Sequence, residues 1–196
     1  MLIIGLTGGI GSGKTTISKC FASFGIPIYI ADDEAKLLMT RSKVVKRKLV
    51  QLFGDLAYVD GELNRPYLAS KIFKDKALLL KMNAIVHPKV ASHFKRWLKK
   101  QDAPYVIKEV AIIFENNFES QYDKIITVIA DKDLRINRVM KRDGASKEKI
   151  EAIITNQLSD AEKIKKSDFV ITNNDLELAK KEAKEIHLQI LKSLRM

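Results

Sequence analysis

A glycine-rich stretch near the start of the chain constrains its fold more than any other feature. Residues 2–6 form a short apolar run rich in β-branched side chains, which predicts a buried strand. Residues 8–15, GGIGSGKT, fit the pattern G-x-x-x-x-G-K-[ST] at every fixed position. Apolar residues at helical spacing follow, among them Ile17 and Phe21. Strand, glycine loop and helix in this order predict a binding site for a nucleoside triphosphate.

Phosphate chemistry explains the residue types in this loop. Several backbone N–H groups must converge on the phosphate oxygens, and they do so only where no Cβ blocks the approach. The N-terminus of the following helix adds a partial positive charge. We expect the Lys14 ammonium to reach the β- and γ-phosphates and the Thr15 hydroxyl to bind Mg²⁺. The predicted ATP-binding residues here are Gly9, Gly11, Ser12, Gly13, Lys14, Thr15 and Thr16.

Composition narrows the class of protein. The chain has 196 residues, 46% of them hydrophobic and 30% charged, which fits one soluble globular domain with room for an inserted subdomain. No apolar run approaches the ~20 residues that a membrane span requires, so we expect no membrane partner. The lone Cys20 excludes an internal disulfide and favours a reducing, cytoplasmic location.

A formal net charge of +11 favours anionic partners, either nucleic acid or a small ligand with several phosphates. The lysines are spread along the chain, and no RNP, KH or zinc-finger spacing accompanies them. We therefore expect a small polyphosphate ligand and no nucleic acid partner.

A second buried strand is predicted at residues 28–30, and Asp32 follows it directly. In an open parallel sheet, ligands bind beyond the carboxyl ends of the strands, so this carboxylate is expected near the transferring phosphate. There it would orient and deprotonate an acceptor hydroxyl. Position alone leaves a second interpretation equally open, in which Asp32 caps a helix that begins near Glu34.

Residues 35–100 are predicted to be mostly helical, because apolar side chains recur at spacings of three and four. A simple crossover between parallel strands is much shorter, so we interpret the stretch as an acceptor-binding subdomain. His87 lies before Pro88 and either contacts a ligand or marks a helix boundary.

Three more strands are expected, near residues 105–107, 125–130 and 169–172. No apolar run ends in Asp as a Walker B strand does, and Glu109 is the nearest substitute. Its carboxylate would serve the water shell of the metal, position a ligand, or lie at the edge of the core. An amphipathic helix follows the last strand and runs to Leu194.

Arg135, Arg138 and Arg142 recur at i, i+3 and i+7, which predicts three guanidinium groups on one helical face. Arginine suits bidentate phosphate contacts and the charge that develops in phosphoryl transfer. A helical hairpin here would form a lid over ATP. The alternative is an exposed helix with surface ion pairs.

The predicted fold is α/β, a three-layer α/β/α sandwich with a parallel central sheet, a helical acceptor-binding subdomain and a small helical lid. We expect a single domain over residues 1–196. Its core would comprise residues 1–34, 103–134 and 166–196, the insertion about 35–102 and the lid about 135–160.

The whole chain resembles the dephospho-coenzyme A kinase family. Residues 6–16 match that family's LTGGIGSGK-[ST]-T, and residues 31–35 match its D-A-D-x-x-A segment with Asp32 at the catalytic aspartate. The other matches, in order along the chain, are Arg65, Leu68, Phe73, His87-Pro88, Arg138, Arg142-Asp143, Gln157 and residues 171–174.

The chain departs from the family's pattern at three places. Ile30 replaces the first Asp of D-A-D, which removes a second carboxylate near the metal. In the segment D-x-P-L-L-x-E, Glu109 replaces Asp and Ala111 replaces Pro. Thr172 replaces the Asp of the closing D-N-[NG] segment.

The resemblance implies transfer of the ATP γ-phosphate to the 3′-hydroxyl of dephospho-CoA, the last step of coenzyme A synthesis, with Mg²⁺ as cofactor. It implies that Asp32 activates the hydroxyl while Lys14, Arg138 and Arg142 act on the transferring phosphate. Asn173 and Asn174 would lie beside adenine, and Arg65, His87 and Glu109 would contact the acceptor. A monomer or weak homo-oligomer is expected.

Two other functions remain open from the residues alone. The first is a P-loop kinase for another small metabolite or a nucleotide. The second is an ATPase stimulated by nucleic acid; a GTPase would need an N-K-x-D motif, which does not occur.

Overall fold

The computed structural model describes residues 1–72 and 75–194 of the chain, apart from the Lys76 side chain. It divides into two compact units. Met1–Ile30 and Gln101–Met196 form one, here called the sheet unit, and Ala31–Lys100 form the other, here called the helical unit. Phe73, which belongs to the matched family pattern, lies outside the described residues.

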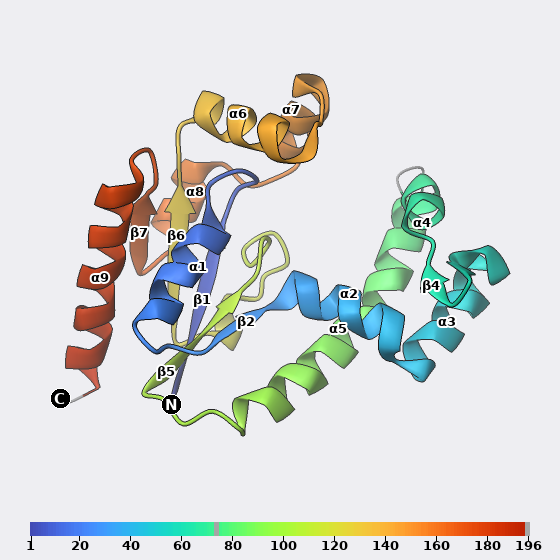
Figure 1. Ribbon diagram of the computed structural model, residues 1–196, viewed down its shortest axis with the longest axis horizontal. Coiled ribbons are helices and arrows are strands. Elements are labelled where there is room, and N and C mark those ends of the chain that lie inside the picture. Colours follow the sequence, from blue (N-terminus) through green and yellow to red (C-terminus); the bar gives the residue numbers. More distant parts are fainter. Residues whose placement is uncertain (73–74, 195–196) are drawn as a thin grey trace. The chain divides into compact units, whose positions relative to one another are not determined.

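The sheet unit is built on five parallel strands in the order β2-β5-β1-β6-β7 (Figure 1). The glycine loop follows the central strand, β1, whose Leu6 lies between Glu109 and Ile126 in register. Because the strands are parallel, their carboxyl ends meet at one edge, where the sequence predicts the site. The strands are β1 (Leu2–Gly8), β2 (Ile28–Ile30), β5 (Tyr105–Glu109), β6 (Lys124–Ile129) and β7 (Phe169–Thr172).

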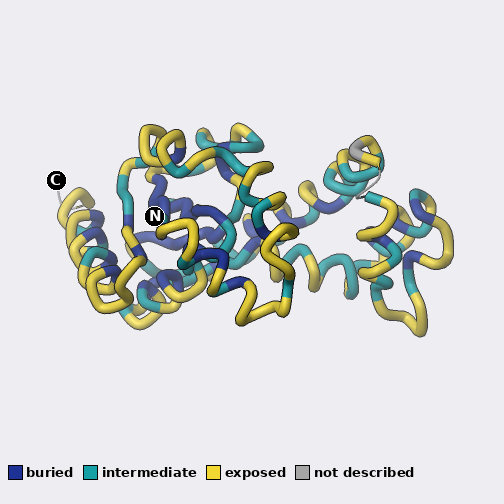
Figure 2. Tube along the Cα trace, turned by 90° about the horizontal axis from the view of Figure 1, so that it is seen from above, coloured by how far each residue is buried: buried dark blue, intermediate teal, exposed yellow. Residues whose placement is uncertain are grey.

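Layers of side chains cover both faces of this sheet. Helices α1 (Lys14–Ser23) and α9 (Leu176–Ser193) pack on one face and share a core with the strands. The other face carries the turns after β5, the 3₁₀ helix η2 (Glu119–Gln121) and the segment leading into α8 (Asp160–Lys165), around buried Ile113 and Phe114. Figure 2 shows buried and exposed residues alternating within the turns of α9, beside the C-terminus. The predicted α/β/α class is confirmed.

Two helices of the predicted lid follow β6. They are α6 (Lys132–Asp143) and α7 (Lys147–Thr155), which pack together through Ile136, Val139 and Ile150. Gly144 ends α6 in the left-handed conformation with φ of 63°, and the Ser146 hydroxyl caps α7 by accepting the Lys149 N–H. These local signals explain the hairpin; its closing over ATP stays a prediction.

The helical unit comprises most of the predicted insertion. A short antiparallel hairpin, with its turn at Asp60-Gly61, interrupts the stretch that the sequence predicts to be mostly helical. The core of this unit includes Leu49, Phe53, Val86 and Phe94. Its elements are α2 (Ala31–Arg41), α3 (Lys43–Phe53), η1 (Asp55–Ala57), β3 (Tyr58–Val59), β4 (Glu62–Leu63), α4 (Arg65–Ile72) and α5 (Lys76–Leu98).

Two expectations about helix ends are wrong. Helix α2 begins at Ala31, so Asp32 lies inside the first turn and does not cap a helix starting near Glu34. Helix α5 continues through Pro88, so His87 does not mark a helix boundary. Proline removes one backbone donor, but packing of α5 against α2, α3 and α4 holds the helix together.

Candidate active site

The glycine loop has a backbone that only glycine adopts readily. Gly11 and Gly13 have φ of 76° and 92°. A Cβ on Gly13 would also collide with the Asn173 side-chain amide, and one on Gly11 would meet the Arg135 carbonyl oxygen. Neighbouring segments therefore pack directly on the loop backbone, and Lys14 begins α1 immediately after it.

Lys14 and Thr15 are both engaged within the sheet unit. The Lys14 ammonium donates to the carbonyl oxygens of Gly8 at 2.9 Å and Gly9 at 3.1 Å, so it lies folded over the loop. The Thr15 hydroxyl donates to Glu109 Oε1 at 3.0 Å, and the Ser18 hydroxyl donates to Glu109 Oε2 at 2.9 Å. Glu109 is only 6% exposed. Its carboxylate thus lies against the hydroxyl that the sequence assigns to Mg²⁺.

A cavity of about 380 Å³ adjoins the loop. All of its lining residues except Val139 are predicted from the sequence to bind ATP or to act on the transferring phosphate, and its charged lining is entirely basic. The volume falls within the ~300–1,000 Å³ of typical ligand sites. The lining residues are Gly11, Gly13, Lys14, Thr15, Thr16, Arg138, Val139 and Arg142.

Arg138 and Arg142 both line this cavity, but their guanidinium groups differ in the hydrogen bonds that they already make. Arg138 Nη2 donates to the Asn173 carbonyl oxygen at 2.9 Å, while Nη1 is buried and has no hydrogen-bond partner among the residues that the structure describes. Arg142 donates twice to Asp143, at 2.7 Å each, and these hydrogen bonds raise the pKa of the Arg142 guanidinium. Arg138 is thus the buried donor that best suits an incoming anion.

Arg135 shares the predicted helical spacing with Arg138 and Arg142 but does not line the cavity with them. It is 5% exposed, its Nε donates to the Ile10 carbonyl oxygen at 2.9 Å, and its Nη1 pairs with Asp160 at 3.0 Å. A Cβ on Gly9 would collide with its guanidinium. Arg135 therefore supports the loop from outside the cavity, a role set by the partner on α8 that helical spacing alone does not specify.

The two asparagines after β7 hold loops in place. Asn173, 3% exposed, donates from Nδ2 to the Ser12 carbonyl oxygen at 2.7 Å. Asn174 Oδ1 accepts the Asp131 N–H at 2.8 Å. These hydrogen bonds give both side chains a structural role, and their contact with adenine stays a prediction.

The remaining predicted residues belong to the helical unit. Asp32 is exposed in the first turn of α2, two residues after β2. Arg65 is the exposed first residue of α4, and His87 is exposed on α5. The sheet unit thus holds the residues predicted for ATP, while those predicted for the acceptor, apart from Glu109, lie on three helices of the other unit.

Sequence reasoning missed Ser18 and gave Gln157 no role. Ser18 follows Thr15 by three residues on α1, so helical geometry alone places both hydroxyls on one face. Gln157 lies in a short connection, and its Oε1 accepts the Ile10 N–H at 2.9 Å, a contact with no local signal in the sequence.

Comparison with known proteins identifies the family. The family model described as dephospho-CoA kinase (CoaE) matches residues 2–178. A dephospho-CoA kinase of Bacteroides fragilis is 38% identical over 172 residues, covering 87% of this chain and 84% of the relative. That of Fusobacterium nucleatum is 40% identical over 175 residues, covering 89% and 90%.

A solved structure has the same fold. The crystal structure of TT1252 from Thermus thermophilus superimposes with a TM-score of 0.88 at 32% identity, covering 96% of each chain. Over the described residues, no helix combines the length and apolarity needed to cross a membrane. The chain belongs to the dephospho-CoA kinase family.

Proposed function

We propose that this kinase transfers the γ-phosphate of ATP to the 3′-hydroxyl of dephospho-CoA. The observation that carries the proposal is the basic cavity, where Lys14, Thr15, Arg138 and Arg142 converge beside the glycine loop. A phosphoryl group in transfer carries charge on its equatorial oxygens, and catalysis comes mostly from positioning and from balancing that charge. Family membership supplies the acceptor.

The chain's own cations act first on the triphosphate. The Lys14 ammonium would exchange its hydrogen bonds to the Gly8 and Gly9 carbonyl oxygens for hydrogen bonds to phosphate oxygens. The free-energy cost of this exchange is small, because one set of acceptors takes the place of another. Arg138 Nη1, which has no acceptor in the described part of the chain, would donate to a phosphate oxygen, while Nη2 stays bonded to the Asn173 carbonyl oxygen. Arg142, already held by Asp143, would add charge from the end of α6.

Magnesium fits the oxygen groups beside the loop. It prefers hard oxygen ligands and usually shares its shell between one or two side chains, substrate phosphates and water. The Thr15 hydroxyl would bind the ion, and buried Glu109 would hold the hydroxyl and a bound water. When bound, Mg²⁺ neutralises charge on the β- and γ-phosphates. This placement favours a metal-side role for Glu109 over the predicted contact with the acceptor.

Asp32 would act on the acceptor. Its exposed carboxylate follows the carboxyl end of β2, the edge of an α/β sheet at which ligands bind. It would accept a hydrogen bond from the 3′-hydroxyl, orient it toward the γ-phosphate and take its proton. Arg65 and His87 would contact the acceptor on the helical unit. The α6–α7 hairpin would exclude water as a lid.

Acceptor-dependent release of ADP tests the proposal. Purified protein receives ATP and Mg²⁺ with dephospho-CoA, AMP, shikimate or an oligonucleotide in separate reactions. We expect stimulation by dephospho-CoA alone, and none in a matched Lys14→Ala variant. Stronger stimulation by AMP or shikimate would assign a different small-molecule kinase, and stimulation by the oligonucleotide with a steep salt dependence would indicate a nucleic-acid-dependent ATPase.

A further inference from the structure

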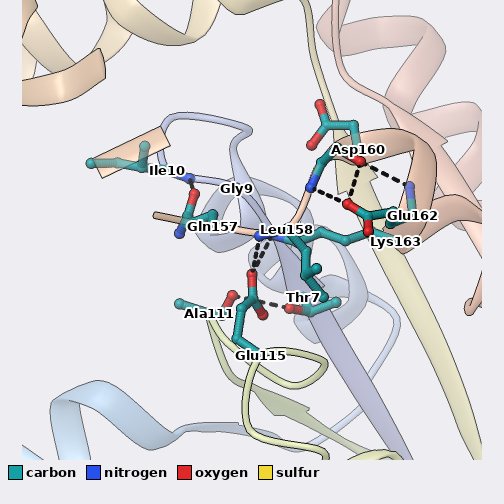
Figure 3. Close-up of polar contacts among 12 residues, drawn as sticks. Thr7, Gly9, Ile10, Ala111, Glu115, Gln157, Leu158, Asp160, Glu162 and Lys163 are labelled. Carbon is teal, nitrogen blue, oxygen red and sulfur yellow. Dashed lines mark hydrogen bonds and ion pairs between the residues drawn. The ribbon is translucent and has the colours of Figure 1, made fainter. Parts of the chain in front are cut away.

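Ile10, at the tip of the glycine loop, is held at both of its backbone groups. Its N–H donates to Gln157 Oε1 at 2.9 Å, as Figure 3 shows, and its carbonyl oxygen accepts from Arg135 Nε at 2.9 Å. Its side chain packs against the apolar cluster formed by α6 and α7. The Ile10 N–H is therefore already bonded to a side chain, and the tip is held before ATP arrives.

Both contacts lead back to one short segment, residues 157–163. Gln157 is its first residue, and Asp160 within it pairs with Arg135 at 3.0 Å. Ser159 starts α8 with a capping box, in which its hydroxyl accepts the Glu162 N–H and the Glu162 side chain accepts the Ser159 N–H. Such a cap fixes the direction in which the chain enters the helix. The segment is thus rigid where it meets the loop.

A buried ion pair links this segment to Glu115. Glu115 Oε1 accepts the Leu158 N–H at 3.1 Å and pairs with the Lys163 ammonium at 3.0 Å (Figure 3). Lys163 is 0% exposed, and Glu115 retains 15% exposure of its side chain. Burying two charges is expensive, and an apolar pair of similar size often stabilises a fold as well. An apolar pair, however, has no acceptor for the Leu158 N–H, which is next to Gln157 in the chain.

We propose that Gln157 is a positioning residue for the phosphate-binding loop and that the Glu115 side-chain oxygen, by accepting the Leu158 N–H, holds Gln157 in place. Gln157 contacts the loop tip in the structure, so its effect on phosphate transfer passes through the loop backbone. The inference rests on ATP binding by the loop, which the proposed function also requires. Its measurements use ATP without an acceptor, so the two can fail separately.

The first test removes the acceptor oxygen of Gln157. Gln157→Met keeps the length of the side chain and leaves the Ile10 N–H without its partner. Calorimetric titration with ATP and Mg²⁺ should give a Kd about 5- to 10-fold higher, the range expected for one lost hydrogen bond. Asn156→Leu is the matched control, since the one described acceptor of the Asn156 side chain is the nearby Ala152 carbonyl oxygen. It should leave the Kd within about twofold.

The second test separates the ion pair's charge from its acceptor. Glu115→Gln/Lys163→Met and Glu115→Leu/Lys163→Met both remove the two charges, and only the first keeps an oxygen for the Leu158 N–H. The first should bind ATP within about twofold of the unchanged protein, and the second should match Gln157→Met. Adding Gln157→Met to the second should raise the Kd little further, because both changes interrupt one path.

Several outcomes would overturn the inference. They are an unchanged Kd in Gln157→Met, equal Kd values for the two double variants, or fully additive effects. Thermal unfolding of each variant accompanies the titrations, because loss of melting temperature with an unchanged Kd would make these residues merely structural. In turnover, KM for ATP should rise while KM for dephospho-CoA stays constant. If Gln157→Met fails to fold, the comparison of the two double variants still decides.

Discussion

Replacing Glu109 by Gln tests whether this residue acts beside the metal, contacts the acceptor or lies only at the edge of the core. The Glu109 carboxylate accepts the hydroxyls of Thr15 and Ser18, and the Ser18 hydroxyl also lies 3.1 Å from the Thr15 carbonyl oxygen. In Glu109→Gln the amide oxygen would accept from Thr15, and the amide N–H would donate to Ser18, whose own hydrogen would turn to the Thr15 carbonyl oxygen. All polar groups keep partners, so only the charge is lost.

The magnitudes follow from this rearrangement. With its hydrogen bonds conserved, Glu109→Gln should change the free energy of unfolding by less than about 1 kcal/mol. Groups that orient a metal ligand typically change metal affinity or activity by about 10–100-fold when replaced. Glu109→Ala should instead lose about 1–3 kcal/mol, because it leaves a buried hydroxyl and a cavity, and its melting temperature should fall by about 2–12 °C.

The assay is a titration of turnover with MgCl₂ at saturating ATP and dephospho-CoA. Glu109→Gln should need about 10–100-fold more Mg²⁺ for half-maximal rate, with an almost unchanged melting temperature. The matched control is Ser18→Ala, which removes the other hydroxyl on this carboxylate and keeps the charge. A normal Mg²⁺ dependence combined with a raised KM for dephospho-CoA would refute the metal-side role and favour contact with the acceptor.

Three further predictions concern single side chains. Asp32→Asn should lower kcat by about 100-fold or more while the Kd for ATP stays within twofold, since general-base catalysis acts in the transition state; an equal loss of ATP binding, measured by calorimetry, would make Asp32 a structural or metal residue. Arg138→Met should reduce kcat about 100-fold or more, and Arg142→Met clearly less, because of these two arginines only Arg138 has a buried donor without a partner among the described residues; equal effects in steady-state kinetics would contradict this difference. Burial lowers the pKa of His187, which is hydrogen-bonded to Tyr105 at 2.7 Å, so the folded state binds fewer protons there than the unfolded state. The stability that neutral His187 contributes is present above its unfolded pKa of about 6.5 and falls as the pH drops below that value. Urea unfolding should therefore give a lower free energy of unfolding at pH 5 than at pH 7.5, and this decrease should be smaller in His187→Gln than in the unchanged protein.

The sequence predicts those parts of the site that depend on local geometry. The spacing within residues 8–15 is enough for strand, loop and helix, because each glycine, the lysine and the threonine act through positions a few residues apart. The parallel sheet is predictable for a similar reason, since its strands are short apolar runs buried on both faces. Helical periodicity likewise predicts the mostly helical stretch after β2, although not its hairpin.

Contacts between distant segments lie beyond this reasoning. Arg135 repeats the helical spacing of Arg138, yet it turns to Ile10 and Asp160 because α8 supplies an acid there. Glu109 stands where several roles are open in sequence, and only its bonds to α1 distinguish them. Helix α5 continues past Pro88 because tertiary packing outweighs the local preference to stop.

Several buried polar side chains bond the glycine loop, and the chemistry of phosphate binding explains why they are placed there. Burying a polar or charged side chain is costly unless it gains partners, so such groups are kept where they have a use. In the part of the chain that the structure describes, several gather around the loop: Glu109, Arg135 and Asn173 contact it directly, and Lys163 lies one step behind. A phosphate-binding loop is a set of backbone dipoles, and its donors are strongest when they need no reorganisation as charge develops. Side chains that bind the outward-facing carbonyl oxygens and N–H groups of the loop leave its remaining N–H groups for the ligand, so Ile10 can serve catalysis through the loop backbone.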